Sequence, residues 1–237
     1  SLSIGVGQLA HVIRRNLDML YILENNGVYG LTKGQFSASA DIGSKSKKGV
    51  ANEQIPIDPV LLALALGASF VARSFSGDKE QLVPLIKAGL SHSGFAIIDV
   101  LSPCVTFNDH EGSTKSYSYV REHSEAPVAV DYVAPQREIQ ITYAPGEVLP
   151  VTMHDGSSIL LRKLNPDYDP TDRAHAAEYV QERAMRNEFV TGLIYVDQKR
   201  RDFHARHNTA EAALNSVPFE RLCPGAAKLP KILASFR

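Results

Sequence analysis

The chain has 237 residues, which is enough for one large α/β domain or for a core domain with a smaller appendage. Its 25 lysines and arginines nearly balance its 26 aspartates and glutamates, so composition gives no reason to expect nucleic-acid binding or a basic membrane-facing surface. The longest apolar run, at 60–71, is too short to span a membrane, and no signal-peptide pattern precedes it, so we expect a cytoplasmic protein.

Helical and strand patterns alternate over the first hundred residues. Helices are predicted at 4–16, 58–68 and 78–92, and strands at 17–23, 70–75 and 94–101. The strand at 17–23 reads as buried on both faces, and the Ser- and Lys-rich stretch 37–53 reads as a long loop, either a lid or a solvated excursion. This alternation predicts an α/β fold, a doubly wound and mainly parallel sheet with helices on both faces.

A second character begins after Cys104. Alternating residues around HDGS predict an antiparallel hairpin within 138–164, followed by a helix that starts at the capping sequence DPTDR, a short strand at 192–196 and a charged helix at 199–214. We therefore expect two parts, a core at 1–110 and a C-terminal α+β appendage at 111–237.

The turn ENNGVYGLTKGQ at 24–35 follows the first predicted strand, where sheets of this class bind their ligands. Asn26 can offer a neutral oxygen to a hard cation, and the carbonyl of Val28 a second one. Two protein oxygens are enough to bind Mg²⁺ only when a diphosphate supplies further ligands. By spacing alone, NNG is also an ordinary turn sequence.

The run GQLAHVIRRNLDMLYILENNGVYGLTKGQFSA resembles the thiamine-diphosphate-binding segment of 2-oxoacid:ferredoxin oxidoreductase beta subunits, most closely the 2-oxoglutarate type. In that family a Gly-Asp-Gly-Asp precedes a segment similar to SLSIG, so we expect this half of the motif to lie upstream of residue 1. The resemblance is strong over residues 1 to about 110 and looser through HDGSSILLRKLNPDYDPTDR.

The resemblance implies a role for each residue of the turn. Asn26 and the Val28 carbonyl would bind Mg²⁺, and thiamine diphosphate would be lined by Gly30, Leu31 and Thr32. Lys33 stands where pyruvate-type relatives have glycine, and its ammonium would hold a carboxylate of the 2-oxo acid or a phosphate of coenzyme A. An exposed loop lysine is the other interpretation.

Two cysteines are present, Cys104 and Cys223, and we expect both thiols to be free of disulfides. SPCVTFN resembles the segment that delivers one cysteine of a [4Fe–4S] cluster, so the resemblance assigns Cys104 as a cluster ligand. The other three ligands are absent from this sequence, so the chain as given is not expected to hold the cluster. His204 and His207 have the i, i+3 spacing of metal ligands, but a solvated helix face is favoured because no third ligand is evident.

The implied reaction is oxidative decarboxylation of a 2-oxo acid to an acyl-coenzyme A, with electrons passing to ferredoxin. The implied partner is an alpha, or alpha and gamma, subunit of the same enzyme. A non-oxidative thiamine-dependent decarboxylase or synthase would share the NNG turn without the SPC segment, and a catalytically silent subunit is the third possibility.

Overall fold

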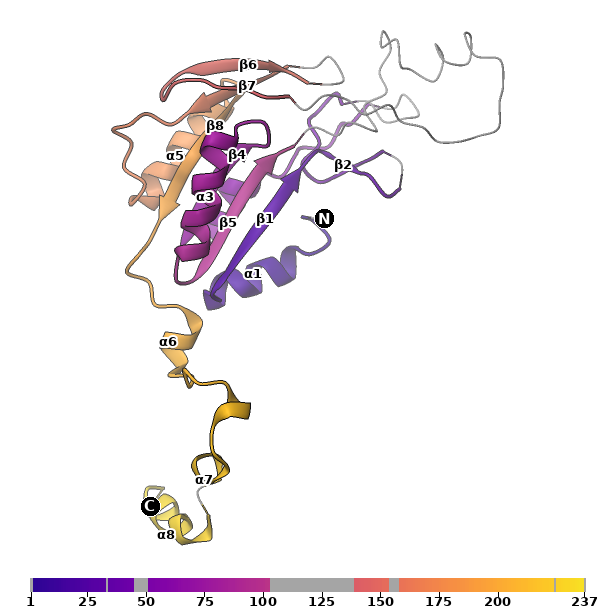
Figure 1. The fold of residues 1–237 in the computed structure, drawn as a ribbon. Coiled ribbons are helices and arrows are strands. Elements are labelled where there is room, and N and C mark those ends of the chain that lie inside the picture. Colours follow the sequence, from indigo (N-terminus) through magenta and orange to yellow (C-terminus); the bar gives the residue numbers. More distant parts are fainter. Residues whose placement is uncertain are drawn as a thin grey trace, which may run out of the picture. The chain divides into compact units, whose positions relative to one another are not determined.

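A six-stranded mixed sheet is the centre of the first of two units, Ser1–Phe203 (Figure 1). The structure is a computed structural model that describes residues 2–32, 34–44, 51–102, 139–153, 158–223 and 225–236. The strands lie in the order β1-β5-β4-β8-β7-β6; β1, β5 and β4 are mutually parallel, and β8 is antiparallel to β4. Their bounds are β1 Met19–Asn25, β4 Phe70–Phe75, β5 Phe95–Leu101, β6 Val148–Thr152, β7 Ser158–Lys163 and β8 Glu188–Val196.

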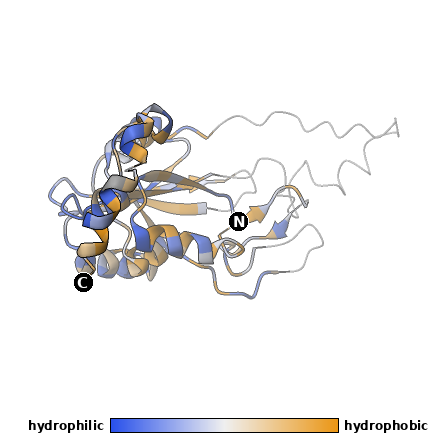
Figure 2. Cartoon of the chain, turned by 90° about the horizontal axis from the view of Figure 1, so that it is seen from below, coloured by the Kyte–Doolittle hydropathy of each residue, from blue (hydrophilic) through white to orange (hydrophobic). Residues whose placement is uncertain are grey.

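Helices cover both faces of this sheet. Residues of α1, α2 and α5 share one apolar cluster with β4, β5 and β8, whereas α3 packs in a second cluster on the opposite face. Helix α1 carries both hydrophilic and hydrophobic residues, as expected for an element with one face on a sheet, whereas α2 is apolar along its whole length (Figure 2). Their bounds are α1 Val6–Arg15, α2 Pro59–Leu66, α3 Lys79–Ser91 and α5 Arg173–Ala184. The predicted fold class is confirmed.

The first strand differs from its prediction as a strand buried on both faces. None of its residues is fully buried, and Met19 and Ile22 are 39% and 44% exposed. The physical reason is its position, because β1 is the outermost strand of the sheet among the described residues and pairs only with β5. A short apolar run without alternation is compatible with a central strand and with an edge strand, so the sequence pattern does not distinguish these two positions.

The predicted hairpin is confirmed, because β6 and β7 pair in antiparallel fashion. Its HDGS turn lies outside the described residues. These strands do not form a separate sheet: β7 pairs in parallel with β8, and β8 joins them to β4. The expected boundary near residue 110 lies outside the described residues and stays a prediction.

The second unit, His204–Arg237, consists of short helices. The predicted helix at 199–214 is much shorter in the structure, because Asn208 adopts a left-handed backbone with φ 48° just after α6. Among the described residues, no helix is long and apolar enough to cross a membrane. The elements here are α6 Phe203–His207, η1 Leu214–Ser216, α7 Phe219–Leu222, η2 Ala226–Lys228 and α8 Leu229–Ala234.

Candidate functional site

The carboxyl ends of three parallel strands meet at one edge of the sheet. Asn25 of β1 is in register with Leu101 of β5, which is in register with Phe75 of β4. Two backbone hydrogen bonds hold the residues that follow β5 and β4 against the neighbouring strand. Ser102 N donates to the Asn25 carbonyl at 3.0 Å, and Ser76 N donates to the Leu101 carbonyl at 2.9 Å. This is the edge at which parallel α/β sheets bind ligands.

The turn that begins with Asn26 leaves β1 at this edge. Gly27 follows with φ 70°, a conformation that favours glycine, and the chain then forms a small hairpin of β2 (Val28–Tyr29) and β3 (Gln35–Phe36). The side-chain oxygen Oδ1 of Asn26 accepts a hydrogen bond from Val28 N at 3.1 Å. Such a local bond uses one lone pair of the amide oxygen and leaves the other open.

The hairpin orients the backbone of Val28 toward Asn26. The carbonyls of Gly27 and Tyr29 accept hydrogen bonds from the returning chain, at Ser37 N and Gly34 N respectively. In an antiparallel pair, the backbone N–H and C=O groups of every second residue point toward the partner strand. Since the Gly27 and Tyr29 carbonyls do so, the backbone groups of Val28 point away from β3. The Val28 carbonyl therefore lies on the same side of the hairpin as the Asn26 side chain, to which its N–H donates.

The other predicted residues of the turn lie at the tip of the hairpin. Gly30 belongs to the turn after β2, and Leu31 is 98% exposed. The Thr32 hydroxyl lies 3.0 Å from Gln35 Oε1 and 3.4 Å from the Tyr29 carbonyl oxygen, so it also stabilises the hairpin. Lys33 lies outside the described residues. The structure thus brings Asn26, Val28, Gly30, Leu31 and Thr32 together on one hairpin.

The described residues include no group of three or more His, Cys, Asp or Glu side chains placed to hold a metal ion. Only a cation that takes most of its ligands from phosphate and water suits the two oxygens of Asn26 and Val28, which fits Mg²⁺ with a diphosphate. Cys104, two residues beyond Ser102, lies outside the described residues. Cys223 is a free, exposed thiol in the second unit. The ring nitrogen Nδ1 of His204 lies 3.0 Å from the hydroxyl oxygen of Thr209.

Three charged side chains beneath the site, of which Arg73 and Asp99 are buried and Asp58 is half-buried, were not singled out from the sequence. Arg73 of β4 donates through Nε to Asp99 of β5 and through Nη2 to Asp58, each at 2.7 Å. Burial raises the pKa of the Asp99 carboxyl, and Arg73 offsets part of that rise. Burial also opposes ionisation of Asp58, but the charge and hydrogen bond of Arg73 hold the pKa of that carboxyl below its ordinary value. The sequence could have indicated this pair. The mainly apolar strands FVARSF and FAIIDVL contain one arginine and one aspartate, and charged side chains are rarely buried without a partner.

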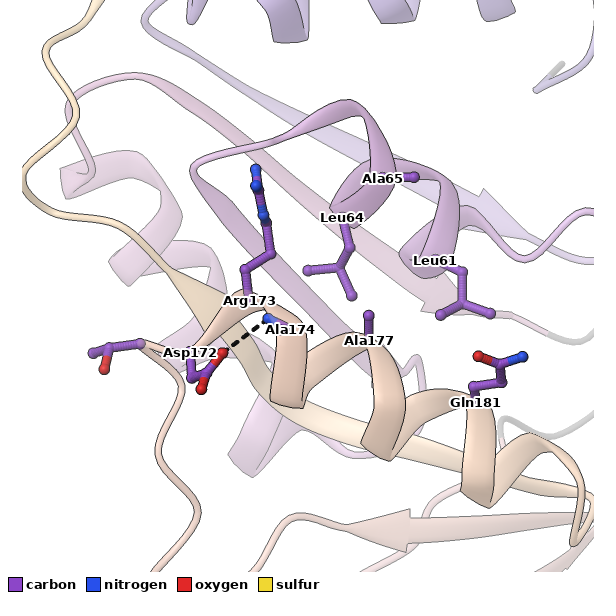
Figure 3. A pocket seen from close by; sticks show the side chains of 9 residues that line it. Leu61, Leu64, Ala65, Asp172, Arg173, Ala174, Ala177 and Gln181 are labelled. Carbon is purple, nitrogen blue, oxygen red and sulfur yellow. Dashed lines mark hydrogen bonds between the residues drawn. The ribbon is translucent and has the colours of Figure 1, made fainter.

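A separate groove of about 790 Å³ lies between α2 and α5 (Figure 3). Leu61, Leu64 and Ala177 form its apolar wall, and Asp172 caps α5 at one end through Ala174 N. None of the predicted site residues lines this groove. It is therefore a feature of the helix layer, distinct from the edge where the strands end.

The comparisons with known proteins divide the chain into two matched regions. Residues 1–100 match the family described as thiamine pyrophosphate enzyme, C-terminal TPP binding domain. Residues 160–212 match the family that describes the C-terminal part of the pyruvate ferredoxin oxidoreductase beta subunit. The fold and the first of these matches make residues 1–100 similar to the TPP-binding domain of thiamine pyrophosphate enzymes.

Individual relatives are similar to about half of the chain. The chain is 46% identical over 117 residues to a 2-oxoacid:ferredoxin oxidoreductase subunit beta of Saccharolobus solfataricus, covering 49% of this chain and 38% of that relative. It is 39% identical over 110 residues to the 2-oxoglutarate oxidoreductase subunit KorB of Mycobacterium tuberculosis, covering 46% and 30%. The resemblance to 2-oxoacid:ferredoxin oxidoreductase beta subunits is confirmed, and the matched segments span 38% and 30% of the length of these two relatives.

A solved structure shares the fold along the whole chain. It is the 2-oxoglutarate:ferredoxin oxidoreductase from Magnetococcus marinus with 2-oxoglutarate, coenzyme A and succinyl-CoA bound, with a TM-score of 0.64 at 24% identity. The match covers 100% of this chain and 64% of that one. At this identity the likeness supports the fold alone.

Proposed function

We propose that this chain supplies the thiamine diphosphate site of a 2-oxoacid:ferredoxin oxidoreductase, as part of its beta subunit. The observation that carries the proposal is the hairpin after β1, where the Asn26 oxygen and the outward backbone of Val28 share one side at the carboxyl edge of a parallel sheet. These residues lie within the region 1–100 that matches the thiamine pyrophosphate enzyme family, and a relative named for the same reaction is 46% identical to this chain over 117 residues.

Each residue of the hairpin makes a different contact with the metal or the cofactor. Asn26 Oδ1 and the Val28 carbonyl hold Mg²⁺, whose remaining ligands are diphosphate oxygens and water. Gly30 permits a close backbone approach, Thr32 offers a hydroxyl and an amide to a phosphate, and the exposed Leu31 covers an apolar part of the cofactor. Thiamine diphosphate, when bound, supplies the chemistry of carbon–carbon cleavage beside a carbonyl, and the protein positions and shields it.

Two residues outside the described part of the chain complete the proposal. Lys33 binds an anionic group of a substrate, either a carboxylate of the 2-oxo acid or a phosphate of coenzyme A. Cys104 contributes one thiolate to a [4Fe–4S] cluster, whose other ligands come from elsewhere in the enzyme. In the full-length protein, Cys104→Ala should then lower the iron content, and full iron content would remove it from the ligand set.

The substrate and the partners follow from the same relatives. We propose 2-oxoglutarate as the 2-oxo acid, coenzyme A as the acyl acceptor, ferredoxin as the electron acceptor and an alpha subunit as the partner. The carboxyl group leaves as carbon dioxide, the acyl group passes to the thiol of coenzyme A, and the electrons released reduce ferredoxin.

The test is turnover by the full-length subunit purified with its partner. The proposal predicts ferredoxin reduction that requires 2-oxoglutarate, coenzyme A and thiamine diphosphate together, with pyruvate as the comparison substrate. Release of carbon dioxide without ferredoxin reduction would identify a non-oxidative decarboxylase. Absence of both activities in a folded, cofactor-loaded complex would identify a catalytically silent subunit.

A further inference from the structure

The cofactor-binding segment is long, and both of its ends lie beside one buried arginine. The segment, residues 26–57, begins after Asn25 at the end of β1 and ends at Asp58, which caps α2. Its described parts are organised locally, by the β2–β3 hairpin and by the buried Asn52 side chain, which donates to the carbonyls of Ala40 and Asp41, so the attachment of the segment to the sheet depends on how its ends are held.

The far end of the segment is bound directly to Arg73. Oδ1 of Asp58 accepts hydrogen bonds from Val60 N at 2.8 Å and Leu61 N at 3.1 Å, which cap α2, and from Arg73 Nη2 at 2.7 Å. The Arg73 side chain is only 2% exposed and the Asp58 side chain 24% exposed. A short charge-assisted bond in so buried a place fixes both partners, because breaking it leaves a buried charge unpaired.

The near end of the segment, next to Asn25, is connected to Arg73 through Asp99. Oδ2 of Asp99 accepts from Arg73 Nε at 2.7 Å, and its Oδ1 is buried without a hydrogen-bond partner of normal geometry among the described residues. Asp99 is in register with Leu23 of β1, so Asn25, two residues further along β1, lies on the same face of the sheet as this carboxylate. The Asn25 oxygen accepts from the Ser39 hydroxyl at 2.7 Å, so Asn25 connects Asp99 with the segment itself.

The planar guanidinium is suited to hold both carboxylates at once. Its Nε and Nη2 donate in fixed directions to Asp99 and Asp58, and the ring of Phe189 lies 5.7 Å from its central carbon. Arg73 is also paired in register with Asp99 across β4 and β5, so the sheet itself sets the distance between them.

We propose that Arg73 is a positioning residue that fixes both ends of segment 26–57, through Asp58 at one end and through Asp99 and Asn25 at the other, and so holds the segment ready for thiamine diphosphate. The inference rests on the proposed function for its ligand. The hydrogen bonds of Arg73 go to Asp58 and Asp99 and not to the predicted ligand Asn26, so its role is one of positioning. When only a fraction of molecules has the competent segment, the apparent dissociation constant rises by the inverse of that fraction.

The sharpest variant is Asp58→Asn, because asparagine caps a helix as well as aspartate does but weakens the charged bond to Arg73. Asp172→Asn is the matched control. Asp172 caps α5 with the same geometry, its Oδ1 accepting from Ala174 N at 2.9 Å and His175 N at 3.1 Å, and it makes no salt bridge among the described residues. A second variant, Arg73→Lys, keeps the charge but replaces the two-nitrogen fork with a single ammonium.

Two readouts are measured on the full-length subunit in its complex, well below its melting temperature. Calorimetry with thiamine diphosphate and Mg²⁺ should show a dissociation constant raised about tenfold in Asp58→Asn and Arg73→Lys, as expected if about a tenth of molecules keep the competent segment. Hydrogen exchange without cofactor should accelerate in 26–44 and 51–57 of both variants while the amides of α5 stay protected. Asp172→Asn should change neither quantity.

Wild-type affinity in both Asp58→Asn and Arg73→Lys, or wild-type exchange of segment 26–57 in both, would overturn the inference. If the wild-type complex binds no thiamine diphosphate, the proposed function fails, and the exchange measurement still decides whether Arg73 holds the segment. If the wild-type complex binds the cofactor and the variants bind it equally well, the proposed function stands and the role of Arg73 fails.

Discussion

Substitution of Asn26 by alanine separates the binding role of this residue from its structural role. The Asn26 side chain is exposed and makes one hydrogen bond, from Val28 N at 3.1 Å. Loss of one such exposed bond costs roughly 0.5–1 kcal/mol of unfolding free energy. For a chain of this size that is a fall in melting temperature of about 1–4 °C.

The expected loss of cofactor affinity is larger. Removing even an outer-shell partner of a metal ligand lowers metal affinity about 10–100-fold, so loss of a direct ligand oxygen should cost at least about tenfold, or 1.4 kcal/mol. Calorimetric titration of the full-length complex with thiamine diphosphate in the presence of Mg²⁺ measures this quantity, and the thermal transition measures stability.

Asp169→Ala is the matched control for Asn26→Ala. Its Oδ1 accepts from Thr171 N at 2.8 Å in the same i to i+2 pattern and also from the Thr171 hydroxyl at 2.7 Å, at an exposed position away from the hairpin. The control should lower the melting temperature by at least as much as Asn26→Ala and leave thiamine diphosphate binding intact. Unchanged cofactor affinity in Asn26→Ala, or an equal loss in Asp169→Ala, would refute the reasoning.

Three further predictions concern substrate, packing and pH. Lys33→Met should lower the specificity constant for 2-oxoglutarate, or raise the Michaelis constant for coenzyme A, by about tenfold, and no change in either would leave Lys33 a solvated loop residue. Gly77→Ala places a Cβ 1.7 Å from the Ile139 carbonyl oxygen, so thermal denaturation should show a loss of about 1–3 kcal/mol, and a wild-type melting temperature would contradict the packing. The hydrogen bond from Arg162 lowers the pKa of Glu188 below 4.5, so this group stabilises the fold above that pH and the stabilisation is lost as pH falls through its folded pKa. Urea unfolding should therefore show Glu188→Gln less stable than wild type by about 1.5 kcal/mol at pH 7, with a gap that narrows below pH 4.5; a constant gap would contradict the linkage.

The local elements could be predicted because their signals are local. Asp58 and Asp172 are capping residues at the starts of their helices, and the alternation on either side of HDGS predicts the hairpin that β6 and β7 form. The turn at Asn26 was located from the strand before it and from the family motif. These features depend on neighbours within a few residues along the chain.

The remaining features depend on pairings between distant segments. Whether β1 lies at the edge or in the centre of the sheet depends on which strands flank it, and the apolar run at 17–23 is the same in both cases. The contact of Arg73 with Asp99 depends on the register of β4 against β5, which no local pattern specifies. Likewise, the pairing of β8 with β4 joins two segments that lie far apart in the sequence, and no local pattern specifies it.

The most direct test of the central claim is an experimental structure of the full-length complex with thiamine diphosphate and Mg²⁺. The account predicts the metal at about 2.0–2.1 Å from Asn26 Oδ1 and from the Val28 carbonyl oxygen, with the diphosphate over the hairpin that joins β2 and β3. Mg²⁺ and diphosphate bound elsewhere, with Asn26 Oδ1 still engaged only by Val28 N, would contradict it.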